Sequence, residues 1–226
     1  MSGSLVRADA LEVGYGLPVC PPMTFTLDAG QVLAVVGANG TGKSTLLRTV
    51  VGLLEPHAGS LTVLGAVPDE RSASFRADVA ADLGEDAFFP SLTAREHLLL
   101  VANGHGVDDP GGLADELLDE LGLTDRAAAV PSALSSGQRR RLVIASVLAR
   151  PRAMLVLDEP EQRLDAGMRR ALTARIVEER EDGGAALLAT HDPDVVRGAA
   201  TAVLLIGDEA VGLVGPDEGA DAIERL

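Results

Sequence analysis

The sequence predicts an α/β fold built around a largely parallel sheet, and three observations support this. Short apolar runs alternate with helical patterns along the chain. Three of these runs, at residues 31–37, 153–160 and 185–192, have the length and branched composition of strands buried on both faces. The first of them leads directly into a glycine-rich loop and then a helical pattern. We therefore expect the three strands to form one central sheet.

The opening segment predicts a second β layer. Its runs "ALEVGYG", "MTFTLDAG" and "SLTVLG" alternate apolar and polar residues and are separated by turn residues. That pattern is typical of a small antiparallel layer, which we expect to pack beside the parallel sheet.

The stretch from Ala87 to Leu134 predicts an all-helical insertion, because the strand pattern disappears there. Thr93 and Glu96 have the spacing of a capping box, and the leucines at 113, 117 and 121 share one helix face. We expect one domain over residues 1–226, with an α/β core at about 1–84 and 142–226 and a helical lobe at about 85–141.

The composition limits the ligands and the location. A net charge of -15 and a pI near 4.6 argue against nucleic acid as a partner, because nucleic acid attracts basic surfaces. The one cysteine, Cys20, cannot form an intramolecular disulfide, and we expect it to be a small buried apolar group. The N-terminus lacks a secretory pattern, and no apolar run approaches the ~20 residues of a membrane span. These features predict a soluble, cytoplasmic protein.

The loop "GANGTGKST" predicts a phosphate site and contains the only lysine of the chain, Lys43. Glycines in such a loop let backbone amides turn toward phosphates, and the following helix directs its positive end at them. The compact ammonium of Lys43 suits the β- and γ-phosphates better than a planar guanidinium would. We expect nucleotide contacts throughout the loop and a magnesium contact from Ser44; the nucleotide-binding set is Gly37, Asn39, Gly40, Thr41, Gly42, Lys43, Ser44 and Thr45. A glycine turn that only caps a helix is the alternative.

Acidic side chains follow the second buried strand, in "MLVLDEP". Asp158 is predicted to hold magnesium, directly or through water. Glu159 should point elsewhere, because strand side chains alternate, and is then free to polarise an attacking water. His191, at the end of the third strand, lies at the same sheet edge and is a candidate γ-phosphate contact. Two acids at a solvated strand end and a structural histidine are the alternatives.

The segment "ALSSGQRRR" begins a helix that we expect to run to about Arg150. Ser135, Gly137 and Gln138 stand at its start, where free amides and the helix dipole favour an anion. An ordinary serine cap is the alternative.

These motifs, in this order and at these intervals, resemble the ATP-binding cassette (ABC) ATPases over nearly the whole chain. "LSSGQ" is similar to the signature motif of that family, often LSGGQ. The resemblance implies ATP and Mg²⁺ as ligands and a head-to-tail dimer, homomeric or heteromeric, in which Ser135 and Gly137 bind the γ-phosphate held by the partner. It also implies a dimer contact from the loop at Asp165 and an adenine contact from Tyr15, the only tyrosine; a half-buried strand aromatic is the alternative for Tyr15.

The sequence departs from the family pattern in two loops. Where the family has a glutamine at the entry to the helical lobe, this chain offers Glu85 or Asp86, and we expect Glu85 to contact magnesium or its water. The loop after Glu159 reads "EQRLD", so that bulky Arg163 replaces a small residue.

The resemblance implies the ATP-hydrolysing subunit of a membrane ABC transporter, with catalytic residues Lys43, Glu159 and His191. The chain would lie at the inner face of the cell membrane and dock on separately encoded membrane subunits, with export the expected direction. Phe88 and Phe89 would form the docking face or, equally, the core of the helical lobe. A soluble, non-transport ABC ATPase and a P-loop small-molecule kinase are the alternative functions.

Overall fold

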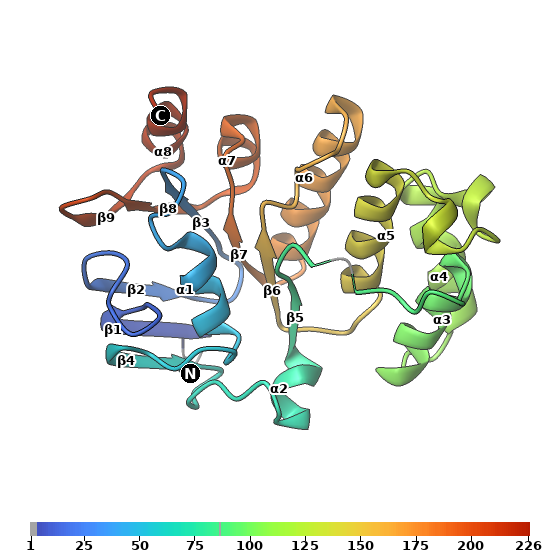
Figure 1. The fold of residues 1–226 in the computed structure, drawn as a ribbon, viewed down its shortest axis with the longest axis horizontal. Coiled ribbons are helices and arrows are strands. Elements are labelled where there is room, and N and C mark those ends of the chain that lie inside the picture. Colours follow the sequence, from blue (N-terminus) through green and yellow to red (C-terminus); the bar gives the residue numbers. More distant parts are fainter. Residues whose placement is uncertain (1–3, 86) are drawn as a thin grey trace.

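A computed structural model describes residues 4–85 and 87–226, and it contains two sheets with helices around them (Figure 1). The larger sheet has the strand order β5-β6-β7-β3-β8-β9. All its neighbouring strands are parallel except β8 and β9, which confirms the expected parallel core. The six strands are β3 (Val32–Gly37), β5 (Val79–Asp82), β6 (Met154–Asp158), β7 (Ala185–Ala189), β8 (Ala202–Ile206) and β9 (Val211–Val214).

The smaller sheet is the predicted antiparallel layer, with the order β2-β1-β4. Its strands are β1 (Val6–Glu12), β2 (Met23–Leu27) and β4 (Ala58–Val63). Helix α1 (Lys43–Val50) contributes Leu46, Leu47 and Val50 to the apolar cluster that these strands share with one face of the larger sheet. The half-buried Cys20 packs against the same cluster, less buried than we expected from the sequence.

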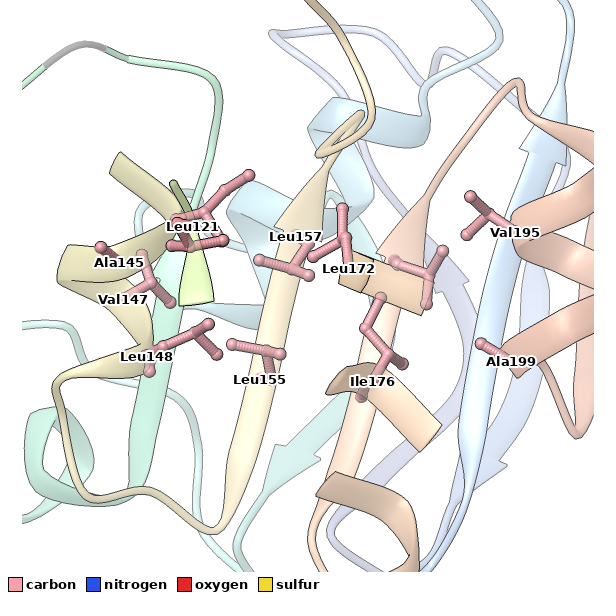
Figure 2. Packing of buried hydrophobic residues seen from close by; sticks show 14 of the residues in the cluster. Leu121, Ala145, Val147, Leu148, Leu155, Leu157, Leu172, Ile176, Val195 and Ala199 are labelled. Carbon is pink, nitrogen blue, oxygen red and sulfur yellow. The ribbon is translucent and has the colours of Figure 1, made fainter. Parts of the chain in front are cut away.

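A second apolar cluster covers the opposite face of the larger sheet. Figure 2 shows Leu148 of α5 and Ile176 of α6 on either side of Leu155 in β6. The helices from α5 to the end of the chain are α5 (Ser136–Leu148), α6 (Ala166–Glu181), α7 (Pro193–Ala199) and α8 (Pro216–Glu224). Burial of this continuous apolar surface fixes α5 against β5 and β6, so that the helical lobe and the sheet share one core.

The helical lobe follows β5, and the described residues form no strand between β5 and β6. Thr93 and Glu96 make the predicted capping box at the start of α3. The shorter elements between β4 and α5 are α2 (Ala73–Asp78), α3 (Ala94–Gly104), α4 (Pro110–Glu120) and the 3-10 turns Thr124–Arg126 and Pro131–Ala133. Helix α5 continues through residues 141 and 142, so the expected lobe boundary falls inside one helix. Within the described ranges, no helix is long and apolar enough to span a membrane.

Candidate functional site

The phosphate loop, residues 37–45, joins β3 to α1 (Figure 1). Gly42 has a φ of 94°, and a Cβ there would lie 2.7 Å from Val19 Cγ2, so that conformation and space both favour glycine. At Gly37 a Cβ would lie 2.5 Å from the carbonyl oxygen of Ile206. No side chain caps the first turn of α1, which leaves its positive end open to an anion.

Lys43 is the first residue of α1 and is 5% exposed. Its ammonium donates to the carbonyl oxygens of Gly37 at 2.8 Å and Ala38 at 3.1 Å. Burial lowers the pKa of Lys43, and the nearby carboxylates of Glu159 and Asp158 oppose that shift. The loop thus folds around the ammonium and holds it beside the two acids.

Asp158 ends β6 and shares a hydrogen bond with Ser44. Burial raises the pKa of Asp158, with a smaller contribution from Glu159, while the Ser44 hydrogen bond acts in the opposite direction. Its Oδ1 is buried without a hydrogen-bond partner. A cavity of about 200 Å³ opens at this point, and its lining is Ser44, Gly84, Arg140, Asp158, Glu159, Gln162 and Arg163.

Glu159 has a φ of 47°, in the left-handed region that non-glycine residues rarely adopt. Its Oε1 lies 3.3 Å from His191 Nε2, and Gln162 Nε2 donates to its Oε2. Glu159 follows β6 with a left-handed backbone, so strand alternation does not apply to it, and it lines the same cavity as Asp158. The structure brings Glu159, His191 and Asn39 to a second cavity of about 610 Å³.

Ser135, Gly137 and Gln138 begin α5, as the sequence predicts. The hydroxyl of Ser135 accepts from Gln138 N at 3.2 Å, and Gln138 Oε1 accepts from Ser135 N at 2.9 Å, so the two side chains form a capping box. A Cβ at Gly137 would lie 3.0 Å from the carbonyl oxygen of Arg163. Figure 1 shows α5 on the other side of β5 and β6 from α1, so the chain does not bring these residues to its own phosphate loop.

Of the remaining predicted contacts, Tyr15 lies in a separate loop, whereas Gly40, Thr41 and Thr45 belong to the phosphate loop itself. Tyr15 is 65% exposed in the loop after β1. The Thr41 hydroxyl donates to the Ala38 carbonyl inside the phosphate loop. Gly40 has a φ of 85°, and Thr45 O accepts from the hydroxyl of Thr49.

Of the two acids that could replace the family glutamine, the structure describes only Glu85. Glu85 is directed at Arg48, with Oε1 3.3 Å from Nη2, and its side chain is 75% exposed. Gly84 lines the cavity that holds Ser44 and Asp158, and Glu85 does not. Asp86 lies outside the described residues.

Sequence reasoning missed a buried arginine beneath the site. Arg140 Nη1 lies 2.7 Å from Asp82 Oδ2, with side chains 5% and 1% exposed. The guanidinium also donates to the carbonyl oxygens of Glu159 at 3.1 Å and Pro160 at 3.3 Å. Arg140 therefore ties α5 and the end of β5 to the loop that carries Glu159. The run of three arginines at 139–141 was the signal, but only the fold shows which of them is buried.

A second missed residue is Glu161, which is 8% exposed. Its Oε1 accepts from the Thr190 hydroxyl at 2.6 Å and from His191 N at 3.0 Å. The sequence gave no sign of this role, apart from the presence of a third acid so close to Asp158 and Glu159.

A phosphate loop between strand and helix, two carboxylates at the end of another parallel strand of the same sheet and an inserted helical lobe define a P-loop ATPase. The family model described as "ABC transporter" matches residues 20–162. The chain is 35% identical over 190 residues to the cytochrome c biogenesis ATP-binding export protein CcmA of Cupriavidus pinatubonensis, covering 84% of each chain. It is 38% identical over 216 residues to the aliphatic sulfonates import ATP-binding protein SsuB of Pseudomonas putida, covering 94% of this chain and 77% of that protein.

Solved structures agree with these relatives. An ATP-binding subunit of an ABC transporter superposes with a TM-score of 0.85 at 25% identity, covering 98% of this chain and 100% of that one. A dimeric ATP-binding cassette in a post-hydrolysis state, bound to ADP and phosphate, gives a TM-score of 0.80 at 21% identity over 93% and 98% of the two chains, and so supports the fold. The chain belongs to the ABC transporter family, and it is an ATPase of that family.

Proposed function

We propose that this ATPase powers transport through separate membrane subunits, and that Lys43, Asp158, Glu159 and His191 form its hydrolytic site. The observation that carries the site is the convergence of the four residues. Lys43 lies close enough to both acids for them to affect its pKa, and Glu159 lies 3.3 Å from His191. The transport role rests on relatives that are named as ATP-binding proteins for export or import.

Each of these residues has a distinct part in hydrolysis. The Lys43 ammonium exchanges its two loop carbonyls for the β- and γ-phosphate oxygens when ATP enters. Glu159 polarises the water that attacks the γ-phosphorus. His191, next to Glu159, donates to the γ-phosphate and helps to stabilise the charge that develops on it.

The residues around Asp158 fit a magnesium ion. Magnesium prefers carboxylate and hydroxyl oxygens, and the buried Oδ1 of Asp158, which has no hydrogen-bond partner, lies in the same cavity as the Ser44 hydroxyl. The described residues contain no group of three or more His, Cys, Asp or Glu side chains that could hold a metal. That suits an ion bound mainly by substrate phosphates and water, with Asp158 and Ser44 as protein ligands. When bound, it would neutralise charge on the phosphates.

We propose that the complete site forms between two copies of the cassette, or between this chain and a related one. The start of α5 lies away from the phosphate loop of its own chain, so Ser135 and Gly137 are available to a γ-phosphate held by a partner (Figure 1). Asp165 caps α6 by accepting from Met168 N at 2.9 Å, which fixes the contact loop before that helix. Glu159→Gln should bind Mg-ATP and accumulate as a dimer on gel filtration; a monomer at saturating ATP would contradict this.

Membrane subunits would dock in a groove of about 720 Å³ between α2, β5 and α3. Phe88 packs against the core, whereas Phe89 is 56% exposed. We therefore assign the docking role to Phe89 and the core role to Phe88. Leu53 and Leu100, 50% and 46% exposed, extend the apolar lining. Docking here would place the chain at the inner face of the membrane. Phe89→Glu should reduce the membrane protein that co-purifies with the chain, whereas Leu213→Glu, at an exposed position on β9, should not.

The direction of transport stays a prediction, because relatives named for export and for import match this chain with similar identity. The alternative functions make different products. A small-molecule kinase would yield a phosphorylated acceptor, whereas the proposed ATPase releases phosphate from ATP with no acceptor present. A non-transport cassette would release phosphate but would not co-purify with a membrane protein.

A further inference from the structure

The buried carboxyl group of Glu161 connects two loops of the hydrolytic site. Glu161 follows β6 in the loop that carries Glu159, yet its Oε1 accepts from two groups after β7, the Thr190 hydroxyl at 2.6 Å and His191 N at 3.0 Å. The Thr190 oxygen in turn accepts from Asp192 N at 3.0 Å. One carboxylate oxygen thus fixes the Thr190 side chain and the His191 main-chain nitrogen, which lie on the two sides of the peptide bond between these residues.

This connection is next to the contact between His191 and Glu159. The backbones of the two loops are also joined by Glu159 N, which donates to the carbonyl oxygen of Ala189 at 2.8 Å. That bond fixes Glu159 relative to β7, but its acceptor, Ala189, precedes His191 by two residues. The Glu161 carboxylate is the group that fixes the His191 main chain itself, and so the direction in which its imidazole leaves the backbone.

We propose that Glu161 is a positioning residue, which sets the His191 imidazole against the Glu159 carboxylate and the γ-phosphate position. The proposal rests on the role given above to His191 in hydrolysis. Loss of the Oε1 acceptor would free the loop at residues 190 and 191 and move the imidazole, while Lys43 and the phosphate loop would stay in place. The rate of hydrolysis should therefore fall, and the affinity for ATP should not.

The test compares Glu161→Leu, which removes the acceptor at similar volume, with Glu161→Gln, which retains one acceptor oxygen. Hydrolysis by Glu161→Leu should fall on the order of tenfold to a hundredfold, because displacement of a reacting group by about 1 Å has effects of that size. The dissociation constant for ATP should be unchanged, and Glu161→Gln should keep most of the wild-type rate. A wild-type rate in Glu161→Leu overturns the proposal.

A double-mutant cycle separates positioning from a general structural effect. If Glu161 acts through His191, Glu161→Leu should cause no further loss in a His191→Ala background. A further loss as large as in the wild-type background means that Glu161 acts through another part of the site, and overturns the proposal. If His191→Ala alone hydrolyses ATP at the wild-type rate, it is the proposed role of His191 that fails.

Nuclear magnetic resonance of the imidazole ¹⁵N nuclei provides a readout that does not depend on activity. The His191 ring signals, assigned with His191→Ala, should shift in Glu161→Leu and stay near their wild-type positions in Glu161→Gln. Because Glu161→Leu leaves two buried donors without an acceptor and can unfold the chain, Glu161→Ala serves as a milder variant, since the space it leaves lets water reach those donors. A folded Glu161→Ala whose rate and His191 signals both match the wild type overturns the proposal.

Discussion

Replacing Asp82 by alanine should destabilise the chain strongly, because it removes the counter-charge of a buried guanidinium. Asp82 Oδ2 lies 2.7 Å from Arg140 Nη1, and the side chains are 1% and 5% exposed. Removing one partner of such a pair costs about 3–5 kcal/mol, since the remaining charge stays buried without compensation. Backbone carbonyls would still accept from Arg140, but they carry no net charge.

The expected loss converts into a change of melting temperature. A chain of 226 residues gains about 0.5 kcal/mol/K of entropy on unfolding, so a loss of about 3–5 kcal/mol lowers the melting temperature by about 6–10 °C. Differential scanning calorimetry of the free chain would measure this. ATP hydrolysis should fall as well, because Arg140 supports the carbonyl oxygens of Glu159 and Pro160.

An exposed arginine–aspartate pair provides the control. Arg95 Nε lies 2.6 Å from Asp115 Oδ1, but the side chains are 39% and 60% exposed. Asp115→Ala should destabilise the chain much less than Asp82→Ala does, because water solvates the remaining charge. Asp82→Leu combined with Arg140→Met should recover much of the stability lost in Asp82→Ala. Equal losses in Asp82→Ala and Asp115→Ala would refute the argument from burial.

Three further predictions concern the site. Lys43→Ala should abolish ATP hydrolysis and weaken nucleotide binding, and Lys43→Arg should also fail, because the guanidinium does not fit the space among the loop carbonyls; full activity in Lys43→Arg would contradict this. Burial, more than the charge of Asp192, raises the pKa of Glu161 from its ordinary value of 4.5, so the folded chain binds this proton more tightly than the unfolded chain. In urea unfolding at increasing pH above 4.5, the wild type should therefore lose stability relative to Glu161→Gln until the pH passes the raised pKa of Glu161; a constant difference would contradict the shift. Because Glu85 lines the proposed docking groove rather than the cavity of Ser44 and Asp158, Glu85→Ala should keep ATP binding and basal hydrolysis but lose stimulation by the membrane partner. Normal stimulation in a variant with alanine at both 85 and 86 would show that neither acid couples the membrane partner to hydrolysis.

Much of the fold could be predicted because its signals are local. The buried strands, the glycine loop and the capping box at Thr93 each depend on residues close together in the sequence. The prediction missed β5, β8 and β9 of the larger sheet; of these, β5 is a four-residue edge strand that follows directly on α2. A strand of this length contains too few residues for alternation to be recognised, and its pairing with β6 is a tertiary feature.

The proximity of Lys43 and Asp158 was predictable, because each stands in a motif at the end of a buried strand of the same parallel sheet. The candidate site was not predictable where function depends on contacts between distant segments. Nothing in the sequence near Glu161 points to Thr190, and nothing near Arg140 points to Asp82. Glu159 illustrates an intermediate case: strand alternation was the reason to expect a role distinct from that of Asp158, but Glu159 lies after the strand in a left-handed conformation and lines the same cavity as Asp158.

The most direct test of the account asks whether ATP is hydrolysed between two copies of the cassette. Lys43→Ala removes the phosphate contact of one copy, and Ser135→Arg blocks the start of α5 in the other. Each variant alone should be inactive. A mixture should regain about one quarter of wild-type hydrolysis, because half of the dimers are mixed and each of these contains one intact site. A mixture no more active than its two components would contradict a site shared between the phosphate loop of one copy and Ser135 of the other.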